Sequence, residues 1–322
     1  MSENTKLHPQ WERFLKEFSD KLAKPSQDIP SVRCLSRTTL TSIFTEILKE
    51  LELPSTFPPG VEILRLLSSM GLASAVTTEK DKTNAPSKEF YLIGISASHD
   101  VTADPFEILQ AYKPSGVICF FSALSYYGLT TQLPTHHHIV TIVEPTTTTK
   151  NVKPKETFPP SSEISTKESN TKKIGTLAFS YDGTPFYTSR RSKNTIPGIK
   201  NRVLNSRTHI KIASKEQTLL DTLHYPLHCG GAEVILEAWD DQRDNLDEKS
   251  FLDLLQKIDS SLLTRRLGAL FDFLDYSPNN ELSLFLKREK EETQNSSELP
   301  PITLFRGLNH THLNSEWKTL TP

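Results

Sequence analysis

Apolar residues recur every three or four positions through the first quarter of the chain, which is the spacing of amphipathic helices. One such run covers about residues 7–23. A second begins near Thr38 or Thr39, both good N-cap residues. A third, VEILRLLSSMG, ends at Gly71, and glycine is a common helix terminator. The pattern therefore predicts three helices in succession.

The next apolar positions favour strands. Two short β-prone runs, LASAVTTE and KEFYLIGI, enclose the polar loop KDKTNAPS, which predicts a hairpin. Helices followed directly by a hairpin are the order of a winged helix-turn-helix, with the third helix as recognition helix and the loop as wing. We expect an N-terminal amphipathic helix over 1–29 and this domain over 30–97. The alternative is a small α+β domain without a DNA role.

A larger mixed α/β domain is expected over 98–322. A helical stretch is followed by a strand from about His138 to Val143. Between 145 and 173 the sequence is almost entirely Thr, Ser, Pro, Lys and Glu, which predicts a flexible insertion between neighbouring strands. Ser214 and Gln217 have capping-box spacing at the start of another helix. Further helical runs follow, and then a tail rich in Asn, Pro and His. The predicted fold class is α+β.

The composition indicates the compartment in which the protein is found. The 322 residues contain only three cysteines, Cys34, Cys119 and Cys229, which argues against a disulfide framework and for a reducing compartment. The N-terminus has no apolar signal core, and no apolar run approaches membrane-spanning length. We expect a cytoplasmic protein.

Charge is distributed unevenly behind a formal net charge of −2. Residues 174–215 carry eight basic side chains and one acidic side chain, whereas residues 216–322 carry ten basic and nineteen acidic ones. A basic segment of this kind is typical of surfaces that meet phosphate, and the alternative is an internal match to the acidic C-terminal helices. The basic residues are Arg190, Arg191, Lys193, Lys200, Arg202, Arg207, Lys211 and Lys215.

The predicted winged helix is neutral by contrast, because residues 30–95 contain seven basic and seven acidic side chains. Arg65 and Ser69 on the third helix, with Lys80, Lys82 and Lys88 of the wing, are the residues expected to face DNA. A DNA reader usually presents more cations, which counts against strong binding by this domain alone. Of the basic segment, we assign the first six residues, from Arg190 to Arg207, to the nucleic-acid surface.

Three consecutive histidines raise the question of a metal. In a strand His136 and His138 share one face and could supply two ligands, whereas a metal site needs three or four. His224 and His228 are separated by the helix breaker Pro226. No phosphate-loop, dinucleotide or nucleophile-elbow motif occurs. We expect no enzyme, cofactor or metal, with a metal-dependent hydrolase using the first pair as a remote alternative.

Three stretches together resemble the AbiEi family of antitoxins. FFSALSYYGLTTQLPTHHHIV is similar to that family's Ser-Ala-Leu…His-Gly-Leu-Thr-x-Gln-x-Pro segment, IKIASKEQTLLDTLHYPLHCGG to its Glu-Arg-Thr-Leu-Leu-Asp…Pro…Gly-Gly segment, and TRRLGALFDFL to its Arg-Leu-Gly helix. The resemblance covers about residues 104–273. Tyr127 stands where the family usually has histidine, and Gln217 where arginine is common. The matched residues look structural, and Asp221 could cap a helix or pair across the core.

The resemblance implies a non-enzymatic role. Family members carry an N-terminal winged helix, bind their own promoter as transcriptional regulators, and counteract a nucleotidyltransferase toxin without necessarily forming a stable complex with it. An antitoxin-like DNA-binding regulator is therefore the leading hypothesis. The alternative is a protein-interaction module whose winged helix no longer binds DNA.

Overall fold

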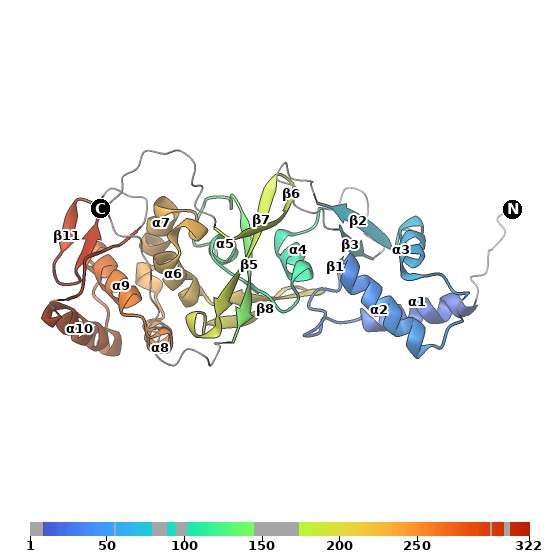
Figure 1. Cartoon of the computed structure of the whole chain (residues 1–322), viewed down its shortest axis with the longest axis horizontal. Helices are drawn as coiled ribbons and strands as arrows, with labels where there is room; N and C mark the ends of the chain where they lie inside the picture. The colour runs from blue at the N-terminus through green and yellow to red at the C-terminus, as the bar shows by residue number, and fades with distance from the viewer. Residues whose placement is uncertain are drawn as a thin grey trace.

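The computed structural model of the chain describes residues 9–54, 56–78, 89–94, 102–144, 174–296, 298–305 and 310–322. The predicted wing lysines, Lys80, Lys82 and Lys88, and the predicted insertion at 145–173 lie outside these residues. The molecule is elongated, with N-terminal helices at one end, a mixed sheet in the middle, and helices with a small sheet at the other end (Figure 1). The predicted α+β class is confirmed.

The N-terminal unit has the element order and sheet of a winged helix. Its three strands form an antiparallel sheet in the order β1-β3-β2. The first helix belongs to the same core as the other two, because the rings of Phe14 and Phe18 contact that of Phe44. The elements are α1 (Pro9–Lys21), β1 (Cys34–Ser36), α2 (Arg37–Glu50), α3 (Gly60–Ser69), β2 (Ala73–Thr77) and β3 (Glu89–Ile93).

Local sequence sets the ends of these helices. α2 begins a little before the predicted Thr38 or Thr39, because the Ser36 hydroxyl accepts a hydrogen bond from the Thr39 amide at 3.1 Å and caps the helix. α3 is followed by Gly71 at φ 70°, a left-handed conformation that favours glycine. The chain then turns directly into β2.

A six-stranded mixed sheet forms the middle of the molecule, in the order β6-β7-β5-β4-β9-β8. β7 lies between β5 and β6, so the prediction that the insertion joins neighbouring strands is wrong: the β6–β7 hairpin places β7 beside β5. The elements of this part are α4 (Pro105–Tyr112), β4 (Val117–Ile118), α5 (Phe121–Tyr126), β5 (His137–Val143), β6 (Thr176–Tyr181), β7 (Thr184–Ser192), β8 (Ile199–Asn205) and β9 (Thr208–Ala213).

Each face of this sheet packs against a different part of the chain. On one face Ile118 and Ile139 share a core with α4 and with Phe90 and Leu92 of the winged helix. On the other face Val140 shares a core with the C-terminal helices. Those helices are α6 (Lys215–His224), α7 (Ala232–Gln242), α8 (Glu248–Ile258), α9 (Ser261–Phe273) and α10 (Asn280–Asn295).

A polar network ties the winged helix to the sheet. The linker before β1 pairs with the start of β9, where the Val32 amide donates to the Arg207 carbonyl at 3.0 Å. Beside it the fully buried Glu107 of α4 forms an ion pair with Arg33 and accepts hydrogen bonds from Asn205 and Thr208. Since a buried carboxylate is costly unless it is paired, this network specifies one orientation of the two units.

The C-terminal region holds more structure than the predicted tail. α10 was missed, and a three-stranded sheet follows it, in the order β10-β12-β11. Its strands are β10 (Ile302–Thr303), β11 (His312–Asn314) and β12 (Thr319–Thr321). Among the helices that the structure describes, none is both long and apolar enough to cross a membrane.

The matched helix α9 explains why the arginine-leucine-glycine pattern is structural. Buried Arg265 donates to the carbonyls of Trp317 and Lys318, and buried Arg266 donates to the carbonyl of Leu223. A Cβ on Gly268 would lie 2.2 Å from the ring of Trp317. Only glycine therefore lets the C-terminal sheet approach this helix so closely.

Candidate nucleic-acid interface

α3 presents an exposed face near one end of the molecule. Val61, Arg65 and Ser69 are exposed on it, and a hollow of about 410 Å³ separates α3 from β2 and β3. The helix is held from behind by Ile63 and Leu67, which are buried in the core. This geometry suits a helix that enters a DNA groove.

The charges around this hollow are paired. Arg65 lies 3.3 Å from Glu62 on the same helix, and Arg37 at the start of α2 lies 2.8 Å from Glu89 on β3. Ser69 donates its hydroxyl proton to the Leu66 carbonyl at 2.8 Å. In the described part of the winged helix, each cation at the hollow therefore has a carboxylate beside it.

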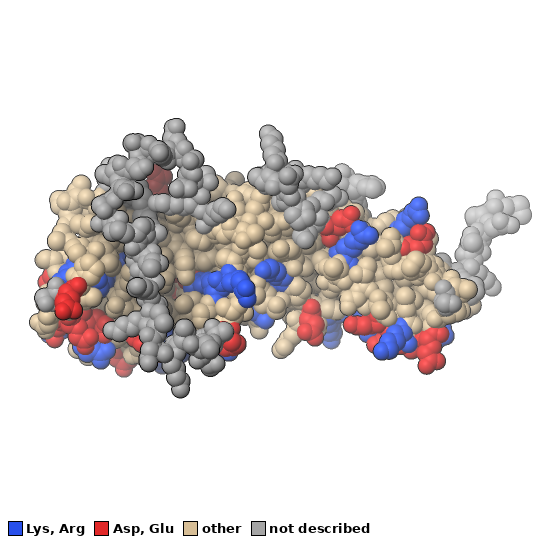
Figure 2. Space-filling view, in the orientation of Figure 1, with Lys and Arg blue, Asp and Glu red and all other residues tan. Residues whose placement is uncertain are grey.

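The middle of the molecule differs, because exposed cations there lack such partners. Arg190 on β7 lies opposite Thr141 of β5, and the strand register brings Lys200 and Arg202 of β8 to the same face of the sheet. These three residues are exposed, and no carboxylate lies within ion-pair distance of them among the residues described. Arg202 lies near Tyr127, whose hydroxyl donates to the Ala213 carbonyl at 2.9 Å. Figure 2 shows basic side chains gathered in the middle of the visible face.

Lys113, at the C-terminal end of α4, joins this group and was missed from the sequence. Its ammonium group donates to the hydroxyls of Thr141 at 2.7 Å and Thr188 at 2.6 Å. Burial and the nearby charge of Arg190 lower the pKa of Lys113. An isolated lysine after a helix carries no signal of this placement in the sequence. We call Lys113, Arg190, Lys200 and Arg202 the basic sheet surface.

Arg191 does not belong to this surface, and its assignment to nucleic-acid binding is wrong. Residues alternate between the two faces of a strand, so the side chain after Arg190 points into the core. Arg191 is 5% exposed, and its guanidinium binds both carboxylate oxygens of Asp221, at 2.6 and 2.9 Å. It also lies over the rings of Phe120 and Tyr225. Burial opposes the charge of Arg191, but Asp221 outweighs burial and raises the pKa of the guanidinium.

The remaining predicted cations have partners. Lys193 is exposed and pairs with Glu144 at 2.9 Å. Arg207 is half-buried, and its guanidinium donates to the Val32 carbonyl at 3.2 Å, so it faces the winged helix. The proposed internal match to the acidic C-terminal helices therefore holds for Arg191 within the described residues and not for the basic sheet surface.

The histidine cluster lies in the core. The rings of His136 and His138 are hydrogen-bonded to the His228 carbonyl at 3.0 Å and to the Ser189 hydroxyl at 2.9 Å. His137 points to the opposite face and packs on Phe186. Burial lowers the pKa of all three, to about 4 for His137. Among the described residues no three His, Cys, Asp or Glu side chains are grouped so as to hold a metal ion.

Comparisons with known proteins give matches only among solved structures. No protein-family model matches the chain, and no curated protein matches it. A solved structure described as the RV2827C protein from Mycobacterium tuberculosis is similar over 96% of this chain and 91% of that chain, with 13% sequence identity and a TM-score of 0.49.

Proposed function

We propose that the chain is a DNA-binding regulator in which α3 docks in a groove while the basic sheet surface contacts the phosphate backbone. The observation that carries the proposal is the position of Arg190, Lys200 and Arg202. They are exposed on one face of the sheet without a carboxylate partner. Four strand spacings separate β7 from β8, so these cations span roughly 19 Å.

The physics of DNA binding supports a division of labour between the two surfaces. Phosphate contacts by lysine and arginine release counterions and supply much of the affinity, whereas base contacts supply specificity. The paired charges at α3 contribute little to the first term. Because the Glu107 network ties the winged helix to the sheet, both surfaces would meet the duplex in one relative orientation.

The resemblance to the AbiEi family extends this proposal to a biological role. On that basis the chain represses its own promoter and counteracts a nucleotidyltransferase toxin. The matched residues Asp221, Arg266 and Gly268 act in the core, which is consistent with a role that needs no catalytic group. If this role is right, expression of the chain should restore the growth of cells that express a nucleotidyltransferase encoded by a neighbouring gene. Continued toxicity would contradict it.

The DNA-binding proposal is tested by the salt dependence of binding. Fluorescence anisotropy would compare the wild type with the triple variant Arg190→Ala, Lys200→Ala and Arg202→Ala on the gene's own upstream duplex and on a scrambled duplex. Each lost phosphate contact lowers the slope of log K against log salt by about 0.9, so a loss of about 2.7 is expected on both duplexes.

A matched control removes three exposed lysines of the C-terminal helices, Lys249, Lys257 and Lys287. This variant loses the same charge and should keep the wild-type slope. An equal slope in the wild type and both variants would remove the basic sheet surface from the mechanism.

The paired charges at α3 favour one second candidate, a protein-interaction module. A hollow lined by Arg37, Glu62, Arg65 and Glu89 offers both signs of charge to a polypeptide partner. If the wild type binds neither duplex at low salt while Arg65→Ala abolishes growth rescue in the co-expression test, this candidate replaces the first.

A further inference from the structure

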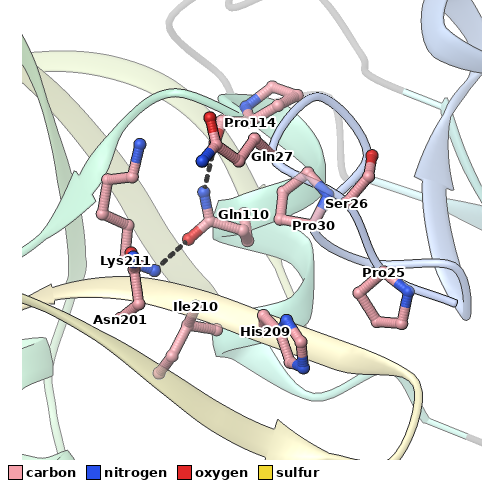
Figure 3. A pocket seen from close by; sticks show the side chains of 10 residues that line it. All are labelled: Pro25, Ser26, Gln27, Pro30, Gln110, Pro114, Asn201, His209, Ile210 and Lys211. Carbon is pink, nitrogen blue, oxygen red and sulfur yellow. Dashed lines mark hydrogen bonds between the residues drawn. The ribbon is translucent and has the colours of Figure 1, made fainter.

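We infer that a cavity between the linker after α1 and the β8–β9 hairpin binds a small anion that carries a flat ring. The cavity measures about 380 Å³, within the range of about 300–1,000 Å³ typical of small-molecule sites. Figure 3 shows the side chains that line it. They come from the linker, from the end of α4 and from strands β8 and β9.

The apolar part of the lining is flat and rigid. Pro25 and Pro30 contribute from the linker, and Pro114 contributes from the turn after α4. Proline rings have no side-chain rotamers to lose, so a flat ligand can pack against them at little entropic cost. These walls favour a planar ring over a flexible chain.

The polar part of the lining selects the sign of charge. Lys211 is the one lining residue with a full charge, and no carboxylate lines the cavity among the residues described. Asn201 lies opposite Lys211 in the strand register, so its amide stands beside the ammonium-bearing side chain. Gln27 supplies a second amide from the linker (Figure 3). A cation flanked by amides suits a carboxylate or phosphate attached to the ring.

Hydrogen bonds hold the cavity open in one shape. The Gln110 side chain accepts from the Lys211 amide at 2.8 Å and donates to the Pro114 carbonyl at 2.7 Å (Figure 3). The His209 amide donates to the Pro30 carbonyl at 2.8 Å, which fixes the linker against β9. Small-molecule sites are usually preformed in this way, because a rigid site avoids the cost of ordering on binding.

The cavity lies between the linker that precedes β1 and the sheet, so a ligand there contacts the linker and the sheet at once. Such a ligand stabilises their joint through mass action. This inference does not depend on DNA binding, since the site is formed by residues outside α3 and outside the basic sheet surface.

Isothermal titration calorimetry of the full chain without DNA tests the inference. The probes are adenosine 5′-monophosphate, uridine 5′-monophosphate and benzoate, which carry both a ring and an anion. Adenosine and inorganic phosphate each lack one half. At least one ring anion should bind saturably, and both half-probes should bind about tenfold more weakly or not at all, the ratio expected for one lost favourable contact.

Two variants locate the site. Lys211→Gln keeps the backbone hydrogen bond to Gln110 and should weaken binding of the ring anion about tenfold. Asn201→Phe places an aromatic residue on an exposed edge strand, where aromatics are tolerated, and should fill the cavity and abolish binding. Lys257→Gln removes an exposed lysine of α8 and should leave affinity unchanged.

Three results would overturn the inference: no saturable binding of any ring anion at millimolar concentration, equal binding by inorganic phosphate, or wild-type affinity in both cavity variants. None of them bears on the salt slope that tests DNA binding, so the two proposals fail separately.

Discussion

A DNA-binding protein usually combines an exposed helix that fits a groove with cations that contact phosphate. In this chain the exposed helix belongs to the winged helix, and the exposed cations belong to the basic sheet surface. α3 has an exposed face, but Arg65 on this helix is paired with Glu62, and Arg37 at the start of α2 is paired with Glu89. The sheet has exposed cations without carboxylate partners among the described residues, but these cations lie on strands and not on an exposed helix. The exposed helix and the exposed cations without carboxylate partners therefore lie in separate units of the described chain, and the Glu107 network joins these units.

The same contrast occurs between two adjacent residues. Arg190 and Arg191 have the same chemistry and neighbouring positions, but the alternation of a strand sends one to the surface and the other into the core. One is available to a polyanion, and the other holds Asp221. The following experiments probe the two regions in order of expected effect.

The largest expected effect is a loss of stability at low pH, and the sheet region should lose stability first. Residues 9–94 contain no histidine, whereas burial lowers the pKa of His137, His224 and His228 to about 4. The unfolded chain binds these protons near pH 6.5 and the folded chain does not. Stability is therefore highest above pH 6.5 and is lost as the pH falls towards 4, by about 3 kcal/mol per histidine.

Hydrogen exchange between pH 7 and pH 4.5 would show which region opens first. The sheet and the helices that pack on it should lose protection before the winged helix does. His137→Phe keeps the ring packing on Phe186 and should flatten the loss of stability. Earlier loss of protection in α1–α3 would contradict the assignment to these histidines.

The next largest effect is a difference in the free energy of unfolding between substitutions of the two arginines of β7, Arg190 and Arg191. Arg191→Ala leaves Asp221 buried without its partner and should lower the free energy of unfolding by about 3–5 kcal/mol, the cost of breaking a buried ion pair. Arg190→Ala should change it by no more than about 0.5 kcal/mol, as surface substitutions usually do. Urea unfolding measures both. Equal losses in the two variants would mean that the strand does not alternate as described.

A smaller effect is expected at the joint. Glu107→Gln removes the charge that pairs with Arg33 in a fully buried position and should cost about 1–3 kcal/mol. Glu144→Gln is the matched control, because Glu144 forms an exposed pair with Lys193 and should cost less than about 1 kcal/mol. Calorimetric unfolding should split into two transitions in the first variant. A single transition at the wild-type temperature would show that the network does not couple the units.

The smallest effect concerns the paired cations of the winged helix. Glu62→Gln with Glu89→Gln leaves Arg65 and Arg37 without their carboxylates. Since exposed pairs are worth about 0–1 kcal/mol, DNA affinity should rise a few-fold, and less at high salt. Anisotropy at two salt concentrations measures this. An unchanged affinity would mean that DNA does not contact the hollow beside α3.

Local patterns in the sequence accounted for much of the fold. The apolar spacing located α1, α2 and α3, and the capping pair Ser214 and Gln217 located the start of α6, where the Ser214 hydroxyl accepts from the Gln217 amide. These features depend on neighbours within a few residues along the chain. α10 was missed because its second half is highly charged and shows little apolar periodicity, and the helix packs against α8 and α9.

The site was less predictable for a related reason. The charge count located the basic segment but could not separate Arg190 from Arg191, since their faces depend on the register of β7 against β5. Lys113 lies 77 residues before Arg190 in the sequence and reaches the same surface through Thr141 and Thr188 of two different strands. The order of charges along the sequence does not show such contacts between distant residues.

Residues that are close together along the chain were enough to predict the helices α1, α2 and α3, the strands β2 and β3, the start of α6 and the uneven distribution of charge. Strand β1 was missed. Three points required the folded chain: which cations lack a carboxylate partner among the described residues, the position of β7 beside β5, and the contact of Glu107 with both units. Burial and pairing decide these points, and both depend on contacts between residues far apart in the chain.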